Sequence, residues 1–157
     1  MSINYYSENE TKDLNPDIYF MKQALIEAHR ASERDEVPIG AVIVCQGRII
    51  GRGHNLTETL IDVTAHAEMQ AITAASGYLG GKYLIDCTLY VTMEPCAMCA
   101  GALGWSQITR VVYGASDEKR GFTRFAPHTL HPKTEVVSGV LGEQCSSLVK
   151  EFFKKKR

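Results

Sequence analysis

The stretch TLYVTMEPCAMC, residues 88–99, joins an apolar run to a segment that carries two cysteines. Its first part is rich in β-branched and aromatic residues, which favours a buried strand over 88–92. Pro95 suits the first turn of a helix, where a backbone N–H has no partner to lose. We therefore expect a helix from Cys96 to about Gly104. A strand that passes directly into a helix is typical of an α/β protein.

The rest of the chain continues this alternation of strands and helices. The other expected elements are helices at 17–34, 65–77 and 143–154, strands at 39–45, 48–55, 108–113 and 134–137, and a long polar loop at 114–133. The first two strands form a hairpin around Gln46-Gly47. This order predicts a three-layer α/β/α sandwich with a five-stranded mixed sheet. We expect a single domain over 15–157, preceded by a loosely ordered segment at 1–14.

Length and composition exclude several classes of protein. The 157 residues are 45% hydrophobic and 22% charged, which is ordinary for a globular domain and excludes collagen-like and disordered chains. No apolar run approaches the roughly 18 residues of a membrane span. The polar, acidic first residues do not resemble a secretion signal. We therefore expect a cytoplasmic protein that does not contact membranes.

Charge is unevenly distributed along the chain. Residues 1–109 carry 7 Lys and Arg against 13 Asp and Glu, a net charge of −6. Residues 110–157 carry 10 against 5, a net charge of +5, so the total is −1. A basic C-terminal third favours an anionic partner, although a solvated tail would have the same composition.

Two short motifs offer the ligands of a metal ion. Cys96 and Cys99 are three residues apart, so they share one face of the expected helix. With the imidazole of His66 they form a three-ligand tetrahedral zinc site whose open position marks a catalytic metal. Glu68 is too close to His66 to be a comfortable second ligand from the same turn. It can instead exchange protons with a water on the metal, as hydrolytic deamination requires.

Other interpretations of these residues remain open. The five cysteines are an odd number in a chain expected to be cytosolic, so a disulfide framework is not expected. A Cys-x-x-Cys pair can be redox-active, but such a pair usually follows the first strand of a thioredoxin-like pattern. His128 and His131 could join Cys96 and Cys99 in a closed structural site, although their polar loop favours surface positions.

His-x-Glu followed by Pro-Cys-x-x-Cys is the signature of the zinc deaminases. More narrowly, the chain resembles the bacterial tRNA-specific adenosine deaminases, members of the cytidine/deoxycytidylate deaminase superfamily, over about residues 17–157. The matching segments lie at 37–42, 54–56, 64–68, 88–102, 110–115 and 143–154. The resemblance implies a cytidine deaminase-like fold. It also implies a homodimer that converts adenosine to inosine at the wobble position of an arginine tRNA.

Residue roles follow from the same resemblance. His66, Cys96 and Cys99 would bind one Zn²⁺ per subunit, hydroxide on the zinc would attack adenine C6, and Glu68 would shuttle protons. Asn55 and the backbone of Ala67 would hold the extruded base, and Asp117 would contact the nucleotide nearby. The expected phosphate contacts to the tRNA anticodon stem-loop come from Lys119, Arg120, Lys150, Lys154, Lys155 and Lys156.

The chain departs from the family at two places. Val63 stands where many members have proline, and residues 118–125 replace a run of small residues with charged and aromatic ones. Two other functions are compatible with the motifs. One is a deaminase of free guanine or cytosine, since Trp105 faintly resembles guanine deaminases. The other is a non-enzymatic structural zinc or RNA-binding module.

Overall fold

The computed structural model describes residue 12 and residues 14–157, so the expected loose segment at 1–14 lies almost wholly outside the described residues. The elements are α2 (Pro16–Glu33), β1 (Gly40–Cys45), β2 (Arg48–His54), α3 (Ala67–Leu79), β3 (Cys87–Met93), α4 (Ala97–Ser106), β4 (Arg110–Ala115), α5 (Phe122–Phe125), β5 (Glu135–Val137) and α6 (Gly142–Lys155). The strand order in the sheet is β2-β1-β3-β4-β5. β1 is antiparallel to β2 and β3, whereas β3, β4 and β5 are parallel. The predicted five-stranded mixed sheet is confirmed.

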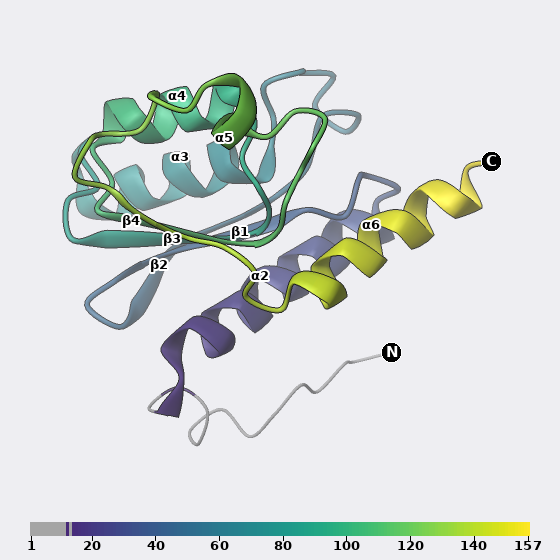
Figure 1. The fold of residues 1–157 in the computed structure, drawn as a ribbon, viewed down its shortest axis with the longest axis horizontal. Coiled ribbons are helices and arrows are strands. Elements are labelled where there is room, and N and C mark those ends of the chain that lie inside the picture. The colour runs from purple at the N-terminus through teal and green to yellow at the C-terminus, as the bar shows by residue number, and fades with distance from the viewer. Residues whose placement is uncertain (1–11, 13) are drawn as a thin grey trace.

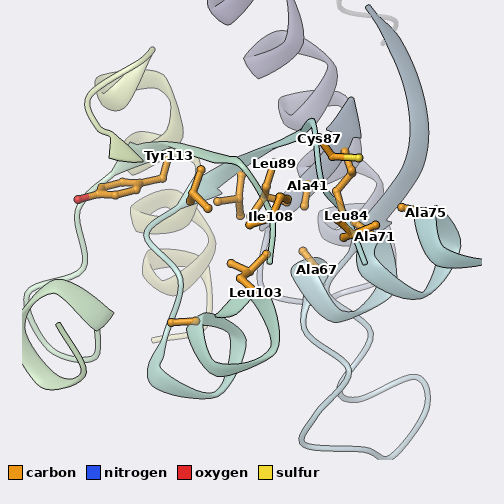
Figure 2. Close-up of a cluster of buried hydrophobic side chains, with 14 of the residues drawn as sticks. Ala41, Ala67, Ala71, Ala75, Leu84, Cys87, Leu89, Leu103, Ile108 and Tyr113 are labelled. Carbon is orange, nitrogen blue, oxygen red and sulfur yellow. The ribbon is translucent and has the colours of Figure 1, made fainter. Parts of the chain in front are cut away.

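Helices cover both faces of the sheet, as the sandwich requires. Figure 1 shows α3, α4 and α5 over one face and α2 and α6 over the other. The core under α3 and α4 includes Ala67, Ala71 and Leu103, which pack on strand residues such as Leu89 (Figure 2). A second core lies between the sheet and α2 and α6. Within the described residues, no helix combines the length and apolarity needed to cross a membrane.

Local sequence explains where α2 begins and why it lies so close to the sheet. The Asn15 side chain accepts a hydrogen bond from the backbone N–H of Ile18 at 3.3 Å, and Pro16 occupies the first turn. Gly40 faces the helix from β1, and a Cβ there would collide with the backbone carbonyl of Ala24. A glycine at this position therefore allows α2 to pack directly against β1.

One edge of the sheet collects the loops that carry the predicted chemistry. The parallel strands β3 and β4 end there, at Met93 and Ala115. Because β1 runs the other way, its first residue, Gly40, pairs with His54 at the end of β2 on this same edge. The segments that follow β2, β3 and β4 thus leave the sheet together, in the position where ligands bind in open α/β sheets.

Two sequence expectations are wrong in detail. The polar segment 114–133 is not a continuous loop, because it contains the short helix α5, whose Phe122 is buried against Tyr113. The helix expected to end near Gly77 continues to Leu79 and is capped by Gly80, which adopts the left-handed conformation at φ 67°. The left-handed residue, and not the first glycine in the sequence, ends the helix.

Candidate metal centre and active site

His66, Cys96 and Cys99 come together from the starts of two helices. His66 directly precedes α3, Cys96 directly precedes α4, and Cys99 lies on the first turn of α4. The Nδ1 atom of His66 lies 3.7 Å from the Sγ of Cys96 and 3.5 Å from the Sγ of Cys99. All three ligand atoms lie within 4.8 Å of one another. The fold thus brings His66 next to Cys96, which lies 30 residues further along the chain.

The donor set fits a zinc ion. Tetrahedral zinc with ordinary Zn–N and Zn–S bonds separates the nitrogen and sulfur ligands by about 3.6 Å, close to both distances seen here. Helix N-termini also favour negative charge, which suits thiolates at the start of α4. His66, Cys96 and Cys99 would hold the ion.

The thiols also show why a cation belongs between them. A hydrogen bond with the Cys99 thiol, together with that of His66, outweighs burial and lowers the pKa of Cys96 to about 3. The same hydrogen bond and burial raise the pKa of Cys99. The hydrogen bond to Cys96 likewise raises the pKa of His66. A divalent cation removes this conflict because it stabilises both thiolates at once.

Glu68 lies beside the triad on the first turn of α3. Its side chain is only 4% exposed, and burial raises the pKa of its carboxyl group. It also lies within hydrogen-bond reach of the Cys99 thiol. A buried carboxyl group whose pKa is raised in this way can accept and return a proton during a reaction, which is the role expected of Glu68.

The other predicted substrate residues gather around the same point. Asn55, Ala67, Glu68 and Asp117 line a cavity of about 260 Å³ together with the ligands His66 and Cys96. Asn55 is buried at the end of β2, and Asp117 follows β4. The Oδ1 atom of Asp117 also accepts hydrogen bonds from the backbone N–H groups of Lys119 and Arg120, at 3.0 and 3.1 Å. The structure thus brings these residues together, while their contacts with a substrate stay predictions.

The predicted basic residues do not form one cluster. Lys119 and Arg120 lie at the mouth of the metal site. Lys150 borders a separate cavity beside Ser116, near the end of β4. Lys154, Lys155 and Lys156 are exposed at the end of α6, and Lys156 forms an ion pair with Asp35 at 2.6 Å. That ion pair brings the end of α6 beside the turn that follows α2, on the side of the molecule seen at the right of Figure 1.

Sequence reasoning missed Glu94, which fastens one wall of the site. Glu94 is buried between β3 and Pro95. Its two carboxylate oxygens accept hydrogen bonds from the N–H of Asp117 at 3.1 Å, and from the N–H and hydroxyl of Thr123 at 3.1 and 2.8 Å. Gly121 packs so closely on this carboxylate that a Cβ would collide with it. Glu94 therefore fixes the segment 117–123 against the metal loop. A charged residue at the end of a buried strand is the only sequence signal of this role.

Glu36 fastens the loop after Asn55, on the other side of the cavity from Glu94, in the same way. It is 1% exposed, and its carboxylate accepts hydrogen bonds from the backbone N–H groups of Glu58 and Thr59 and from the hydroxyl groups of Thr57 and Thr59. Burial alone would raise the pKa of Glu36, but these hydrogen bonds outweigh it and lower that pKa. Glu36 thus holds the loop that follows Asn55.

The alternative metal sites are not seen. All five cysteines lie among the described residues and are free. His128 and His131 are exposed, and across residues 12 and 14–157 only His66, Cys96 and Cys99 form a group able to hold a metal. The expectation that these two histidines are surface residues is confirmed.

A three-ligand metal site beside a buried glutamate, on a three-layer sandwich, is the arrangement of the zinc-dependent nucleobase deaminases. The model of the cytidine and deoxycytidylate deaminase zinc-binding region matches residues 14–115. The chain therefore belongs to this family, and the family's zinc-binding region together with the ligand triad assigns one zinc ion to each chain.

Individual relatives are similar over most of the chain. A tRNA-specific adenosine deaminase of Agrobacterium fabrum is 46% identical over 144 residues, which cover 88% of this chain and 95% of the relative. A solved structure from studies of A-to-I editing by tRNA:A34 deaminases at the wobble position has 47% identity and a TM-score of 0.78, covering 83% of this chain and 98% of that one. A guanine deaminase of Bacillus subtilis is 43% identical with a TM-score of 0.59, but the match covers only 62% of each chain.

Proposed function

We propose that the chain deaminates adenosine to inosine at the wobble position of a tRNA anticodon, with arginine tRNA as the expected substrate. The observation that carries the proposal is the cavity in which Asn55, Glu68 and Asp117 surround the zinc ligands. The tRNA-specific relatives support this choice over a free-base deaminase, because they are 46% and 47% identical over 88% and 83% of this chain, whereas the guanine deaminase of Bacillus subtilis matches only 62% of it.

The described residues can perform the reaction in a simple sequence. When bound, zinc lowers the pKa of water to about 7 and thus supplies a nucleophile for adenine C6 at neutral pH. Glu68 accepts the proton that this water loses and delivers it to N1 of the base. It then accepts the second proton from the oxygen now bonded to C6 and passes it to the departing amine. Asn55 and the backbone of Ala67 orient the base, and Asp117 contacts the nucleotide beside it. Water is consumed, and inosine and ammonia are released.

The basic residues would position the RNA. Lys119 and Arg120 stand at the mouth of the site, and Lys150, Lys154 and Lys155 provide separate positive charges along α6. Such contacts to phosphates hold an anticodon loop in register without reading its sequence. A base in a loop is already poorly stacked, so its extrusion into the cavity costs little. We propose that the protein acts in the cytoplasm, where its substrate is found.

We also propose that the chain forms a homodimer. Several large apolar side chains are exposed in the single chain, among them Trp105 on α4, which is 86% exposed, and Ile61 in the loop after β2. Aromatic side chains such as that of Trp105 are enriched at protein–protein interfaces. Sedimentation should give a mass of two chains. A single-chain mass in wild-type protein would contradict the dimer.

Reading inosine directly tests the proposed activity. Purified protein is incubated with an anticodon stem-loop that carries adenosine at the wobble position, and the nucleosides are then quantified by mass spectrometry. Inosine should form at that position only, and guanine and cytosine should remain unchanged in parallel reactions. Deamination of free guanine or cytosine, with no inosine formed in the RNA, would show that the protein is a free-base deaminase. RNA binding with no deamination of any substrate would indicate a non-enzymatic module.

A further inference from the structure

The short helix α5 presents an exposed aromatic ring from a firmly held segment. Phe125, its last residue, is 58% exposed, whereas Phe122, its first, is buried with its ring edge-on to Tyr113. The N–H of Phe122 donates to the carbonyl of Pro95 at 2.9 Å, and Thr123 is bound by Glu94. Single exposed apolar residues are common on proteins, so the exposure of Phe125 matters only through its surroundings.

Phe125 stands at the entrance to the metal site. It lines an outer cavity of about 590 Å³ together with Val63, Met98 and the zinc ligands His66 and Cys96. The inner cavity that holds Asn55 and Glu68 is also bordered by His66 and Cys96. A substrate that places one base in the inner cavity can therefore place a neighbouring group in the outer one, within reach of the Phe125 ring.

Positive charge surrounds this ring. The guanidinium of Arg124 lies over Phe125, 5.5 Å from the ring centroid, and also donates a hydrogen bond to the carbonyl of Glu118 at 3.3 Å. Lys119 and Arg120 line the same outer cavity. An aromatic surface bordered by three cations is complementary to single-stranded nucleic acid, because bases stack on the ring while phosphates meet the cations. An apolar protein surface would instead have to desolvate these charges.

We propose that Phe125, backed by Arg124, stacks on a base of the RNA that adjoins the base entering the zinc cavity. This inference rests on the proposed deamination of tRNA and adds the contact by which the enzyme holds a neighbouring nucleotide. Phe125 acts as a binding residue that keeps the RNA strand bent at the mouth, so that the target base points inward. The contact belongs to this chain's own version of the segment 118–125, in which charged and aromatic residues are present.

Steady-state kinetics on the anticodon stem-loop test this contact. Phe125→Ala should raise KM by about tenfold, the loss expected for one base–aromatic stack, with kcat nearly unchanged. Phe125→Trp should restore KM because it supplies a larger stacking surface. Tyr78→Ala is the matched control, since Tyr78 is 63% exposed at the end of α3 remote from His66. It should leave both constants unchanged.

A second set of substrates identifies the stacked base. Stem-loops that lack the base on the 5′ or on the 3′ side of the target adenosine are compared with the intact RNA. For wild-type protein, one of the two abasic RNAs should have a KM about tenfold higher than the intact RNA. For Phe125→Ala, that abasic RNA and the intact RNA should have the same KM, because the stacking contact is already lost.

The outcomes separate this contact from the proposed activity. If wild-type protein forms no inosine, the proposed function and the contact both fall. If wild-type protein forms inosine and Phe125→Ala keeps the wild-type KM, only the contact is overturned. The contact is also overturned if Phe125→Ala raises KM by the same factor on the intact RNA and on both abasic RNAs. A change from dimer to monomer on sedimentation of Phe125→Ala likewise overturns it, because the ring would then be a subunit contact.

Discussion

Glu68 and Glu36 are both almost fully buried, yet their surroundings drive their pKa values in opposite directions. Glu68 lies on the floor of the active-site cavity, where burial dominates and raises the pKa of its carboxyl group. Glu36 lies behind one wall, where hydrogen bonds from two backbone N–H groups and two hydroxyl groups overcome burial and lower its pKa. The number of donors around a buried carboxylate therefore separates a group that can exchange protons from one that stays ionised and holds a loop.

Neutralising the two carboxylates gives the strongest contrast. Glu68→Gln should lower kcat on the anticodon stem-loop by about 10²- to 10⁴-fold, the usual contribution of a positioned acid–base group. Glu36→Gln should lower it by a few-fold at most, because Glu36 does not line the cavity. Rapid-quench measurement of inosine gives both values.

Zinc content and thermal unfolding control for this comparison. Glutamine has nearly the same shape as glutamate, so Glu68→Gln should keep one zinc ion per chain and a wild-type unfolding transition. A Glu68→Gln enzyme within tenfold of wild-type kcat would show that another group carries the protons. An equal fall of kcat in Glu68→Gln and Glu36→Gln would show that the two carboxylates do not have the different roles proposed here.

The wall on the other side gives an intermediate effect. Glutamate at position 94 offers two acceptor oxygens, one to Asp117 and one to Thr123, whereas glutamine has only one. Glu94→Gln therefore leaves the N–H of Asp117 or the N–H and hydroxyl of Thr123 without an acceptor. Leaving buried donors unpaired costs about 1–3 kcal/mol, and we expect a roughly tenfold fall in kcat/KM for the stem-loop as the segment 117–123 loosens. Hydrogen exchange of the amides in that segment should become faster.

Glu118→Gln is the matched control for Glu94→Gln. Glu118 is exposed on the same segment, away from the buried carboxylate of Glu94. This control should retain wild-type exchange rates and kcat/KM. Unchanged exchange in Glu94→Gln would mean that the backbone contact between Phe122 and Pro95 suffices to hold the segment.

Local sequence patterns predicted most of the fold and the metal ligands. Alternating apolar runs identified the strands, and the Pro-Cys-x-x-Cys motif placed Cys96 and Cys99 at the start of a helix. The helix begins one residue later than expected, so Pro95 lies before the N-cap Cys96 and not in the first turn. These features depend on residues a few positions apart, so a single sequence contains the necessary information. The wall residues differ because Glu94 meets partners 23 to 29 positions away, and Glu36 meets partners 21 to 23 positions away.

The helix α5 was missed for a related reason. It has only four residues and no side-chain cap, so its own sequence gives little preference for a helix. The buried Phe122 and the carboxylate of Glu94 stabilise it through contacts with β4 and with the loop after β3. Short elements of this kind depend on tertiary contacts, which a periodicity argument does not see.

The smallest expected effect is the pH dependence of the stability that Glu36 provides. Because its pKa is lower in the folded chain than its ordinary value of 4.5, its contribution is complete above that value and is lost as pH falls through the lower folded pKa. The free energy of unfolding of wild-type protein should exceed that of Glu36→Gln by about 1–3 kcal/mol at pH 7, and the difference should shrink below pH 4.5. Urea titrations of both proteins measure it. The zinc ligands are the same in both, so loss of metal in acid cancels in the difference. A difference that stays constant down to pH 3 would mean that the shape of the side chain, and not its charge, holds the loop.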